Sequence, residues 1–250
     1  MEYQLIFASF LAFLSTIIGS FSGGGSSLIL FPLMLMFFND TYISLLIVSK
    51  ISAVVMTFAA SRLHFKKISF DFKLMLFLTI GGLMGTAFGT YLLQYQFNEI
   101  LFERFLAIIL ITVGLYIFFS KNTGIHDGKK DFGIKILLIS AVFSFFINVL
   151  NGMFGGTGIF LTIYLVSVLR MNFIRAIAYT MFNYAILSTS QVIYLAITEN
   201  FDMKLAGAVI IGAIVGGSLG THLQYLKGSL WVKRAAVVML LAIGTKMLMG

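Results

Sequence analysis

The sequence predicts an all-α polytopic membrane protein, and three observations support this fold class. Of the 250 residues, 60% are hydrophobic and 10% are charged, whereas a soluble domain carries about 25% charged residues. Apolar runs that can cross about 30 Å of hydrocarbon, or roughly 20 helical residues, follow one another along the chain. The basic residues behind the net charge of +8 lie mostly in short segments between these runs. That distribution is typical of the positive-inside pattern rather than of a nucleic-acid-binding surface.

Eight of the apolar runs are long enough for full-length spans, and two are short. The short runs are 26–38 and 158–170. No basic region precedes the first run, so we interpret it as a retained span rather than a signal peptide. The chain has no cysteine, which excludes disulfides and thiolate metal sites. The eight longer runs are 3–20, 43–61, 74–95, 100–119, 134–150, 173–197, 203–224 and 229–249.

An internal duplication divides the chain into a first transmembrane repeat at 1–120, a linker at 121–133 and a second repeat at 134–250. The sequence FDFKL at 70–74 is matched by FDMKL at 201–205. Matches of this kind lie 130 to 132 positions apart, and a constant offset indicates a repeat. The row Gly81, Gly85 and Gly89 matches Gly212, Gly216 and Gly220, and the stretch Gly23-Gly24-Gly25 matches Gly155-Gly156-Thr157-Gly158. The four-residue spacing of the two rows predicts close packing of their helices against neighbours.

We expect the two repeats to be inverted, each with four full-length spans plus one short half-helix after a glycine break. Five segments per repeat is an odd number, which reverses the orientation of the second copy. Loop 62–73 carries four basic residues and its counterpart 198–204 carries one. Loop 225–234 carries three and its counterpart 96–104 carries one. This topology places 13 Lys and Arg residues inside and 3 outside, with both termini outside.

The glycine-rich stretch before each short run is the candidate site. Consecutive glycines disfavour a continuous helix, since each costs about 1 kcal/mol relative to Ala. The following run, 26–38, is about 20 Å long at 1.5 Å per residue, so its glycine end should lie within the hydrocarbon layer. Irregular backbone there must be enclosed by protein or line a watery cavity. Two helix N-termini facing one space would bind a small anion; alternatively, the glycines only permit close packing. The residues predicted to bind are Gly23, Gly24, Gly25, Ser26, Ser27, Gly155, Gly156, Thr157 and Gly158.

Charged and polar residues in the spans also favour an anion. All nine Asp and Glu residues lie in or beside loops, whereas a carboxylate relay or cation site needs acids within the membrane. Lys50 lies inside a span, where it either supplies positive charge to an oxyanion or extends to the membrane surface. Its counterpart is Phe182, beside Asn183, which is a further candidate binding residue. The histidines have no metal-ligand spacing. Asn148, Asn151 and Gln191 either line a cavity or bridge helices.

The first break and its copy also resemble a known family. The stretch Gly23-Gly24-Gly25, followed by a short apolar segment with Pro32 and by the degenerate copy Gly155-Gly156-Thr157-Gly158, resembles the TauE/SafE sulfite exporter family of membrane transporters. The second copy departs from the pattern at Thr157 and at Tyr164, where Pro32 would recur. The resemblance covers nearly the whole chain and implies export or uptake of sulfite and organosulfonates.

We therefore expect a secondary transporter of small anions, namely sulfite, sulfonates or related sulfur oxyanions, that works by alternating access in the plasma (inner) membrane. A passive anion channel of the same fold is the alternative. An intramembrane enzyme is disfavoured, because the spans show no pairing of a nucleophile with His or a carboxylate. No cofactor is expected. The expected partners are a small anionic substrate and membrane lipid, without nucleic acid; a coupling proton or sodium ion and a homodimer stay open.

Overall fold

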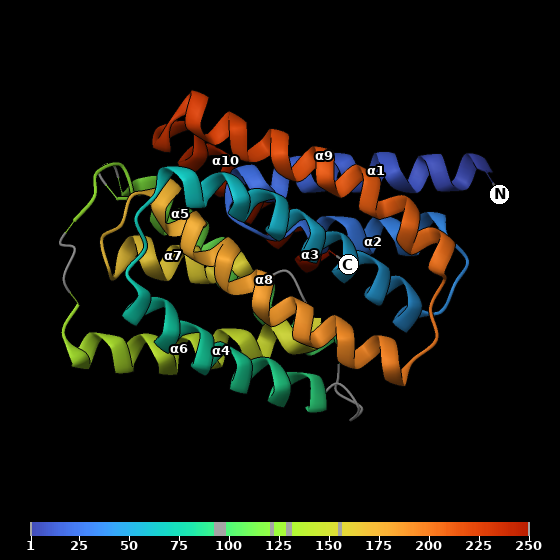
Figure 1. Ribbon diagram of the computed structural model, residues 1–250, viewed down its shortest axis with the longest axis horizontal. Coiled ribbons are helices and arrows are strands. Elements are labelled where there is room, and N and C mark those ends of the chain that lie inside the picture. The colour runs from blue at the N-terminus through green and yellow to red at the C-terminus, as the bar shows by residue number, and fades with distance from the viewer. Residues whose placement is uncertain (1, 93–98, 121–122, 129–131, 155–156, 250) are drawn as a thin grey trace.

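The computed structural model describes residues 2–92, 99–120, 123–128, 132–154 and 157–249. Within these ranges the regular structure is helical (Figure 1), and its ten helices coincide with the ten predicted apolar segments. The helices are α1 (Glu2–Ser22), α2 (Ser26–Phe37), α3 (Tyr42–Lys67), α4 (Phe72–Leu92), α5 (Glu99–Phe119), α6 (Ile134–Phe154), α7 (Gly158–Ser167), α8 (Phe173–Thr198), α9 (Met203–Lys227) and α10 (Ser229–Met249).

Five of the described helices are long and apolar enough to cross a membrane, namely α1, α3, α4, α6 and α9. The prediction of an all-helical, multi-pass membrane fold is therefore confirmed at this level. The other three runs predicted as full spans also form long helices, with 21 residues in α5, 26 in α8 and 21 in α10. The two short runs are short helices, of 12 residues in α2 and 10 in α7.

Two helices extend beyond their predicted apolar runs, at points where basic residues follow the run. Helix α3 continues past 61 to Lys67, and α9 continues past 224 to Lys227. Basic side chains near a helix C-terminus interact favourably with the helix dipole, so a charge marks the membrane surface and not the end of the helix. Helix starts are set by capping side chains: the Asp202 carboxylate, for example, accepts hydrogen bonds from the backbone N–H groups of Lys204 and Leu205.

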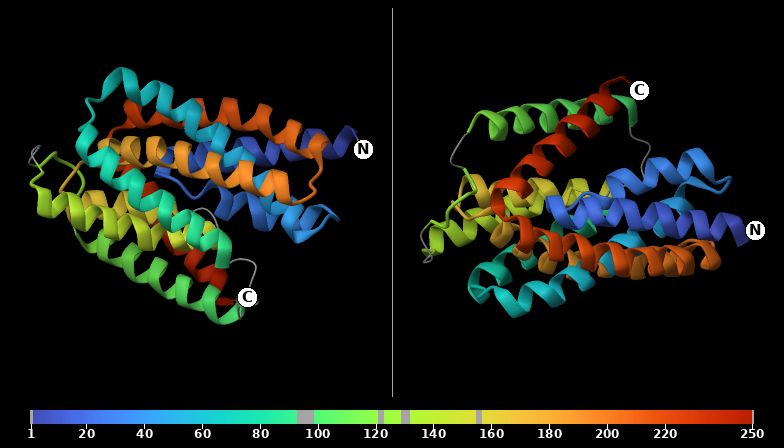
Figure 2. Two further views of the ribbon diagram at one scale, coloured as in Figure 1. Left: turned by 60° about the horizontal axis from the view of Figure 1, so that its bottom comes forward. Right: turned by 90° about the horizontal axis from the view of Figure 1, so that it is seen from above.

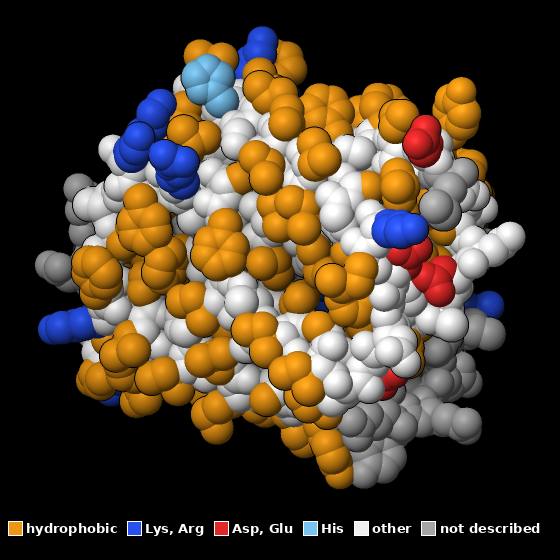
Figure 3. All heavy atoms as spheres, turned by 45° about the vertical axis from the view of Figure 1, so that its right-hand side comes forward, with side chains coloured by type: hydrophobic (Ala, Val, Ile, Leu, Met, Phe, Trp, Pro, Cys, Tyr) orange, Lys and Arg blue, Asp and Glu red, His pale blue; other side chains and the backbone are white. Residues whose placement is uncertain are grey.

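Most helices run roughly along the longest axis of the molecule (Figures 1 and 2), so the loops gather at its two ends. The loops after α3, α7 and α9 lie at one end, which we call the basic end. The loops after α2 and α8 lie at the opposite end together with the N-terminus. Figure 3 shows most Lys and Arg side chains towards one edge, most Asp and Glu side chains towards the other, and hydrophobic side chains between them. This arrangement fits a protein with a lipid-facing belt.

The two glycine rows pack against helices far away in the sequence. A Cβ atom on any glycine of the α4 row would overlap a carbonyl oxygen of α6, and one on the α9 row would overlap backbone or hydroxyl oxygens of α1. The predicted role of these rows in close helix packing is confirmed. The partners were not predicted: α4 pairs with α6, and α9 pairs with α1. The rows are Gly81, Gly85 and Gly89 in α4, and Gly212, Gly216 and Gly220 in α9.

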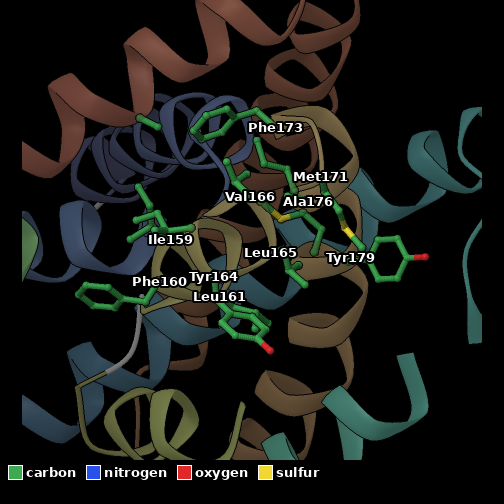
Figure 4. Close-up of a cluster of buried hydrophobic side chains, with 14 of the residues drawn as sticks. Ile159, Phe160, Leu161, Tyr164, Leu165, Val166, Met171, Phe173, Ala176 and Tyr179 are labelled. Atoms are coloured by element: carbon green, nitrogen blue, oxygen red, sulfur yellow. The ribbon is translucent and has the colours of Figure 1, made fainter. Parts of the chain in front are cut away.

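Helix α7 lies in the middle of the largest cluster of buried hydrophobic side chains (Figure 4). Every residue from Gly158 to Val166 is buried. The labelled side chains come from α7, from the turn after it and from the start of α8, and neighbouring helices surround them. The beginning of α7 is therefore held inside the protein, away from lipid.

Candidate functional site

The first glycine break is a tight reversal between α1 and α2. Helix α1 ends at Ser22 and α2 begins at Ser26. Gly23, Gly24 and Gly25 have φ angles of 102°, 120° and 88°, in the left-handed region that side chains with a Cβ rarely adopt. The prediction that this stretch interrupts the helix is confirmed.

The second break lies against the first. Gly155 and Gly156 fall outside the described residues, while Thr157 precedes α7, which begins at Gly158. A Cβ atom on Gly24 would lie 3.1 Å from the Cα atom of Gly158, so the two backbones are in contact. In addition, the Thr162 hydroxyl donates a hydrogen bond of 3.0 Å to the Gly23 carbonyl. The two breaks, far apart in the sequence, therefore form one structural unit.

A small cavity of about 30 Å³ lies beside this contact. That volume holds about two water molecules. Six of the predicted binding residues line it, from both breaks and from α3. They are Gly24, Gly25, Ser26, Ser27, Lys50 and Gly158. The other lining residues are Ala53, Met56, Thr57, Asn151, Thr180, Met181, Tyr184 and Ser188.

Several residues that line this cavity carry hydrogen-bond donors without partners among the described residues. Neither α2 nor α7 has a side-chain hydrogen bond at its N-cap, and the first N–H groups of a helix have no partner within the helix. The Ser26 hydroxyl and the Asn151 side-chain amide nitrogen are buried and have no hydrogen-bond partner among the described residues. Helix N-termini carry a partial positive charge, so the cavity wall offers donors and positive potential.

Lys50 adds a basic side chain to this wall. Its side chain is 3% exposed, so it does not extend to the membrane surface. Its Nζ atom donates to Gln191 Oε1 at 2.8 Å and to the Asn151 carbonyl at 3.3 Å. Among the described residues it forms no ion pair with a carboxylate. A buried charge without a counter-charge is costly, and a bound anion would relieve that cost.

Three predicted residues are placed near the cavity without lining it. The Gly23 carbonyl accepts the bond from Thr162 described above. Thr157 is buried, and its hydroxyl lies 3.1 Å from the Tyr184 hydroxyl. Asn183 faces another helix, because its side-chain nitrogen donates to Thr79 in α4 at 3.2 Å. Thr157 can therefore act on the cavity through Tyr184, whereas Asn183 is a bridge between α8 and α4.

The sequence carried a signal for the missed lining residues on α8. The lining residues Thr180, Tyr184 and Ser188 follow the spacing i, i+4 and i+8, which places them on one helix face. Gln191, at i+11, lies on the same face without lining the cavity. A polar face in an otherwise apolar span points to the protein interior or a cavity. Gln191 extends the network, because its nitrogen donates to Thr90 at 2.9 Å and to the Gly152 carbonyl at 2.6 Å.

The described part of the chain offers the cavity no acidic groups. None of its described Asp or Glu side chains is buried, and no cluster of three or more His, Cys, Asp or Glu residues with metal-binding geometry occurs among the described residues. Most of the cavity wall is apolar, and its polar part carries donors and positive potential, an arrangement that can hold an oxyanion.

Two comparisons with known proteins found matches over most of the chain. The sequence profile of the family described as "Sulfite exporter TauE/SafE" matches residues 8–247. The chain is also 27% identical over 237 residues to a protein of Haemophilus influenzae (strain ATCC 51907 / DSM 11121 / KW20 / Rd) named "Probable membrane transporter protein". That match covers 94% of this chain and 91% of the relative. No solved structure matches the chain.

Proposed function

Because the chain belongs to the sulfite exporter TauE/SafE family of membrane transporters, we propose that it is a secondary transporter that carries a small sulfur oxyanion by alternating access. One observation supports this proposal above the others: Lys50 is buried beside both glycine breaks and forms no ion pair with a carboxylate among the described residues. Sulfite or a sulfonate presents several oxygens that accept hydrogen bonds from such donors.

In this proposal, the oxyanion binds between the two breaks. Backbone N–H groups at the starts of α2 and α7, near Gly24, Gly25 and Thr157, donate to its oxygens, as does the Ser26 hydroxyl. Gly155 and Gly156 of the second break belong to the proposed site as well. Lys50 balances the charge. Because the cavity holds only about two waters, the site must widen before an oxyanion enters.

Alternating access is proposed to follow from two inverted repeats, 1–120 and 134–250, joined by the linker 121–133, with eight full-length spans and two half-helices. The helix contacts support this relation. Helices α1 to α5 of the first repeat correspond in order to α6 to α10 of the second. Under this correspondence the contacting pair α1–α9 becomes α6–α4, and the contacting pair α2–α3 becomes α7–α8. Helices α3 and α8 also run in opposite directions between the two ends (Figure 1). Movement of one repeat against the other would expose the shared site to each side in turn.

The proposal is tested by flux of sulfite, sulfoacetate and taurine in proteoliposomes. We expect at least one of these compounds to exchange, with uptake accelerated by the same compound inside the vesicle. A passive anion channel would show much higher flux without this trans-stimulation. If none of the three moves or competes, the substrate class is wrong.

Replacing Lys50 tests the site itself. We expect Lys50→Met to weaken binding by about 2–5 kcal/mol, since the substrate loses its buried charge partner, which is a decrease in affinity of roughly 30-fold or more. The measurement is the substrate concentration that gives half-maximal counterflow. Lys66→Met, on the exposed side of the same helix, is the matched control. Unchanged counterflow in Lys50→Met, with normal insertion, contradicts the proposed site.

Three further features belong to the proposal. The protein is placed in the plasma (inner) membrane with its basic end inside, and protease accessibility of right-side-out vesicles tests that orientation. The coupling ion is a proton or sodium ion, which imposed gradients of each distinguish. The mass of the protein in nanodiscs distinguishes a monomer from a homodimer.

A further inference from the structure

A buried histidine lies on the helix that carries Lys50, and the oxyanion site does not use it. His64 is 0% exposed. Its Nδ1 atom lies 2.7 Å from the Tyr225 hydroxyl of α9. Its Nε2 atom is buried and has no hydrogen-bond partner among the described residues. Leaving a buried polar atom without a partner costs roughly 1–3 kcal/mol, so we expect this nitrogen to exchange a proton or a hydrogen bond at some stage of transport.

Polar groups on the same face of α3 continue from His64 towards the cavity. Thr57, Ser61 and His64 follow the spacing i, i+4 and i+7, which places them on one face. Thr57 lines the cavity. Ser61 is 6% exposed, and its hydroxyl also has no partner among the described residues. The helix rises about 10 Å from Thr57 to His64 at 1.5 Å per residue, so one or two waters must enter along this face, as the site widens, to complete a hydrogen-bonded path.

On its other side, His64 is connected to the basic end of the molecule. Tyr225 lines a pocket of about 320 Å³ together with Lys67, Asp127 and Arg175. The Lys67 ammonium group lies 4.3 Å from the centre of the Tyr225 ring. Arg175 and Asp127 form an ion pair of 3.6 Å. Tyr225 therefore lies between this pocket and the buried imidazole.

We propose that His64 is the proton-binding site that couples transport of the oxyanion to a proton, with Tyr225 as the relay to the basic end. This inference rests on the proposed function. In the proton path, the Tyr225 hydroxyl gives its proton to Nδ1 and takes one from water in the pocket. The imidazolium then releases its Nε2 proton to water beside Ser61, and the path returns to its starting state when the neutral ring exchanges its tautomer.

Histidine suits this role because it is the side chain that ordinarily gains and loses a proton between about pH 5 and 8. Transporters often relay protons through buried carboxylates, but the described part of this chain buries none. The groups around the pair also matter. Lys67 and Arg175 are cationic and Asp127 is anionic, so an imidazolium is opposed locally by positive charge. A co-transported oxyanion would offset that opposition, which links proton binding to substrate binding.

The test measures uptake of sulfoacetate into proteoliposomes in two ways. The first assay drives uptake with an imposed pH gradient, and the second measures counterflow with equal pH on both sides. We expect His64→Gln to lose gradient-driven accumulation while keeping counterflow, because exchange needs no net proton movement. Tyr225→Phe should slow the gradient-driven component and leave counterflow unchanged. His222→Gln, on an exposed position of α9, is the matched control and should behave as the wild type.

Each outcome bears on the inference. If His64→Gln retains normal gradient-driven accumulation, the inference is overturned. If His64→Gln also loses counterflow through misfolding, Tyr225→Phe decides, since it removes only a hydroxyl; a normal gradient response in that variant overturns the relay and with it the inference. Wild-type protein with counterflow but no response to the pH gradient also overturns it, while leaving the proposed transport function intact. Absence of wild-type counterflow with sulfoacetate, and also with sulfite and taurine in its place, instead contradicts the proposed function.

Discussion

The two short helices that follow the glycine breaks differ in what surrounds them. In α7 every residue from Gly158 to Val166 is buried. In α2 the buried residues are Ser26, Ser27, Leu30 and Met34. One side of α2 borders an apolar groove of about 850 Å³ shared with α1 and α10. Both helices direct their N-termini to the same cavity, but only α7 is enclosed by protein.

The side-chain hydrogen bonds of α7 and α2 differ in the same way as their burial. Along α7, Thr162 bonds to Gly23 and Thr180, and the Tyr164 hydroxyl lies 2.9 Å from that of Ser140. On α2, the Ser26 hydroxyl has no partner among the described residues, and Pro32 removes a backbone donor from the middle of the helix. Helix α7, with its enclosed side chains and paired hydroxyls, is therefore the fixed side of the site. We expect the widening that admits substrate to occur on the side of α2.

The largest expected difference concerns an aromatic residue on each helix. Tyr164 is 3% exposed and stacks on Phe143 with 4.1 Å between ring centres. Tyr164→Ala should lower the free energy of unfolding by about 3–5 kcal/mol, as is usual for a buried aromatic residue. Phe31→Ala, in the part of α2 that faces the groove, should cost less than about 1.5 kcal/mol. Denaturant titration in mixed micelles measures both, and equal losses would remove the distinction between the helices.

The next difference concerns the glycine contact. Gly24→Ala forces a side chain into a φ of 120°, at about 1–2 kcal/mol, and presses its Cβ against Gly158. We expect lower stability and strongly reduced counterflow. Gly158→Ala meets its nearest atoms at 3.4 Å or more and sits in a helix, where Ala is favoured by about 1 kcal/mol; its stability should be unchanged or higher. Equal sensitivity at the two positions would contradict the geometry of the contact.

The smallest difference concerns two hydroxyl groups. Thr162→Val removes the donor to the Gly23 carbonyl and should cost about 1 kcal/mol of stability. Ser26→Ala removes a hydroxyl that has no partner among the described residues, so stability should change by less than about 0.5 kcal/mol. Its effect should appear instead as a higher substrate concentration for half-maximal counterflow. A Ser26→Ala variant with lower stability and unchanged substrate affinity would make Ser26 a structural residue.

Local sequence rules predicted the ten helices, the break at Gly23–Gly25 and the close packing of the glycine rows. Each depends on properties of adjacent residues, namely hydropathy, backbone freedom and periodicity. They also predicted six of the residues that line the cavity, from the break at each short helix and from the one basic residue within a span.

Properties that depend on distant residues were not predicted. The different burial of α2 and α7 was hidden because lipid and protein interior both favour apolar side chains. Lys50 meets Gln191 across 141 positions of sequence, and no local pattern encodes that contact. Asn183 was chosen for lying beside the residue that aligns with Lys50, but its side chain bonds to Thr79 on a different face of α8. Sequence position alone does not give the direction of a side chain on a helix.

The pairing of α1 with α9 has a consequence for biosynthesis. The first helix leaves the ribosome long before its partner, by about 10 to 40 s at 5–20 residues per second. During that interval its small polar face must rest in lipid or against the insertion machinery. The Thr16 and Ser20 hydroxyls lie against the glycines of α9, and each also donates to a carbonyl of its own helix, Ala12 and Ile17 respectively. The hydroxyl groups on this surface of α1 therefore have hydrogen-bond partners within their own helix before α9 has been synthesised.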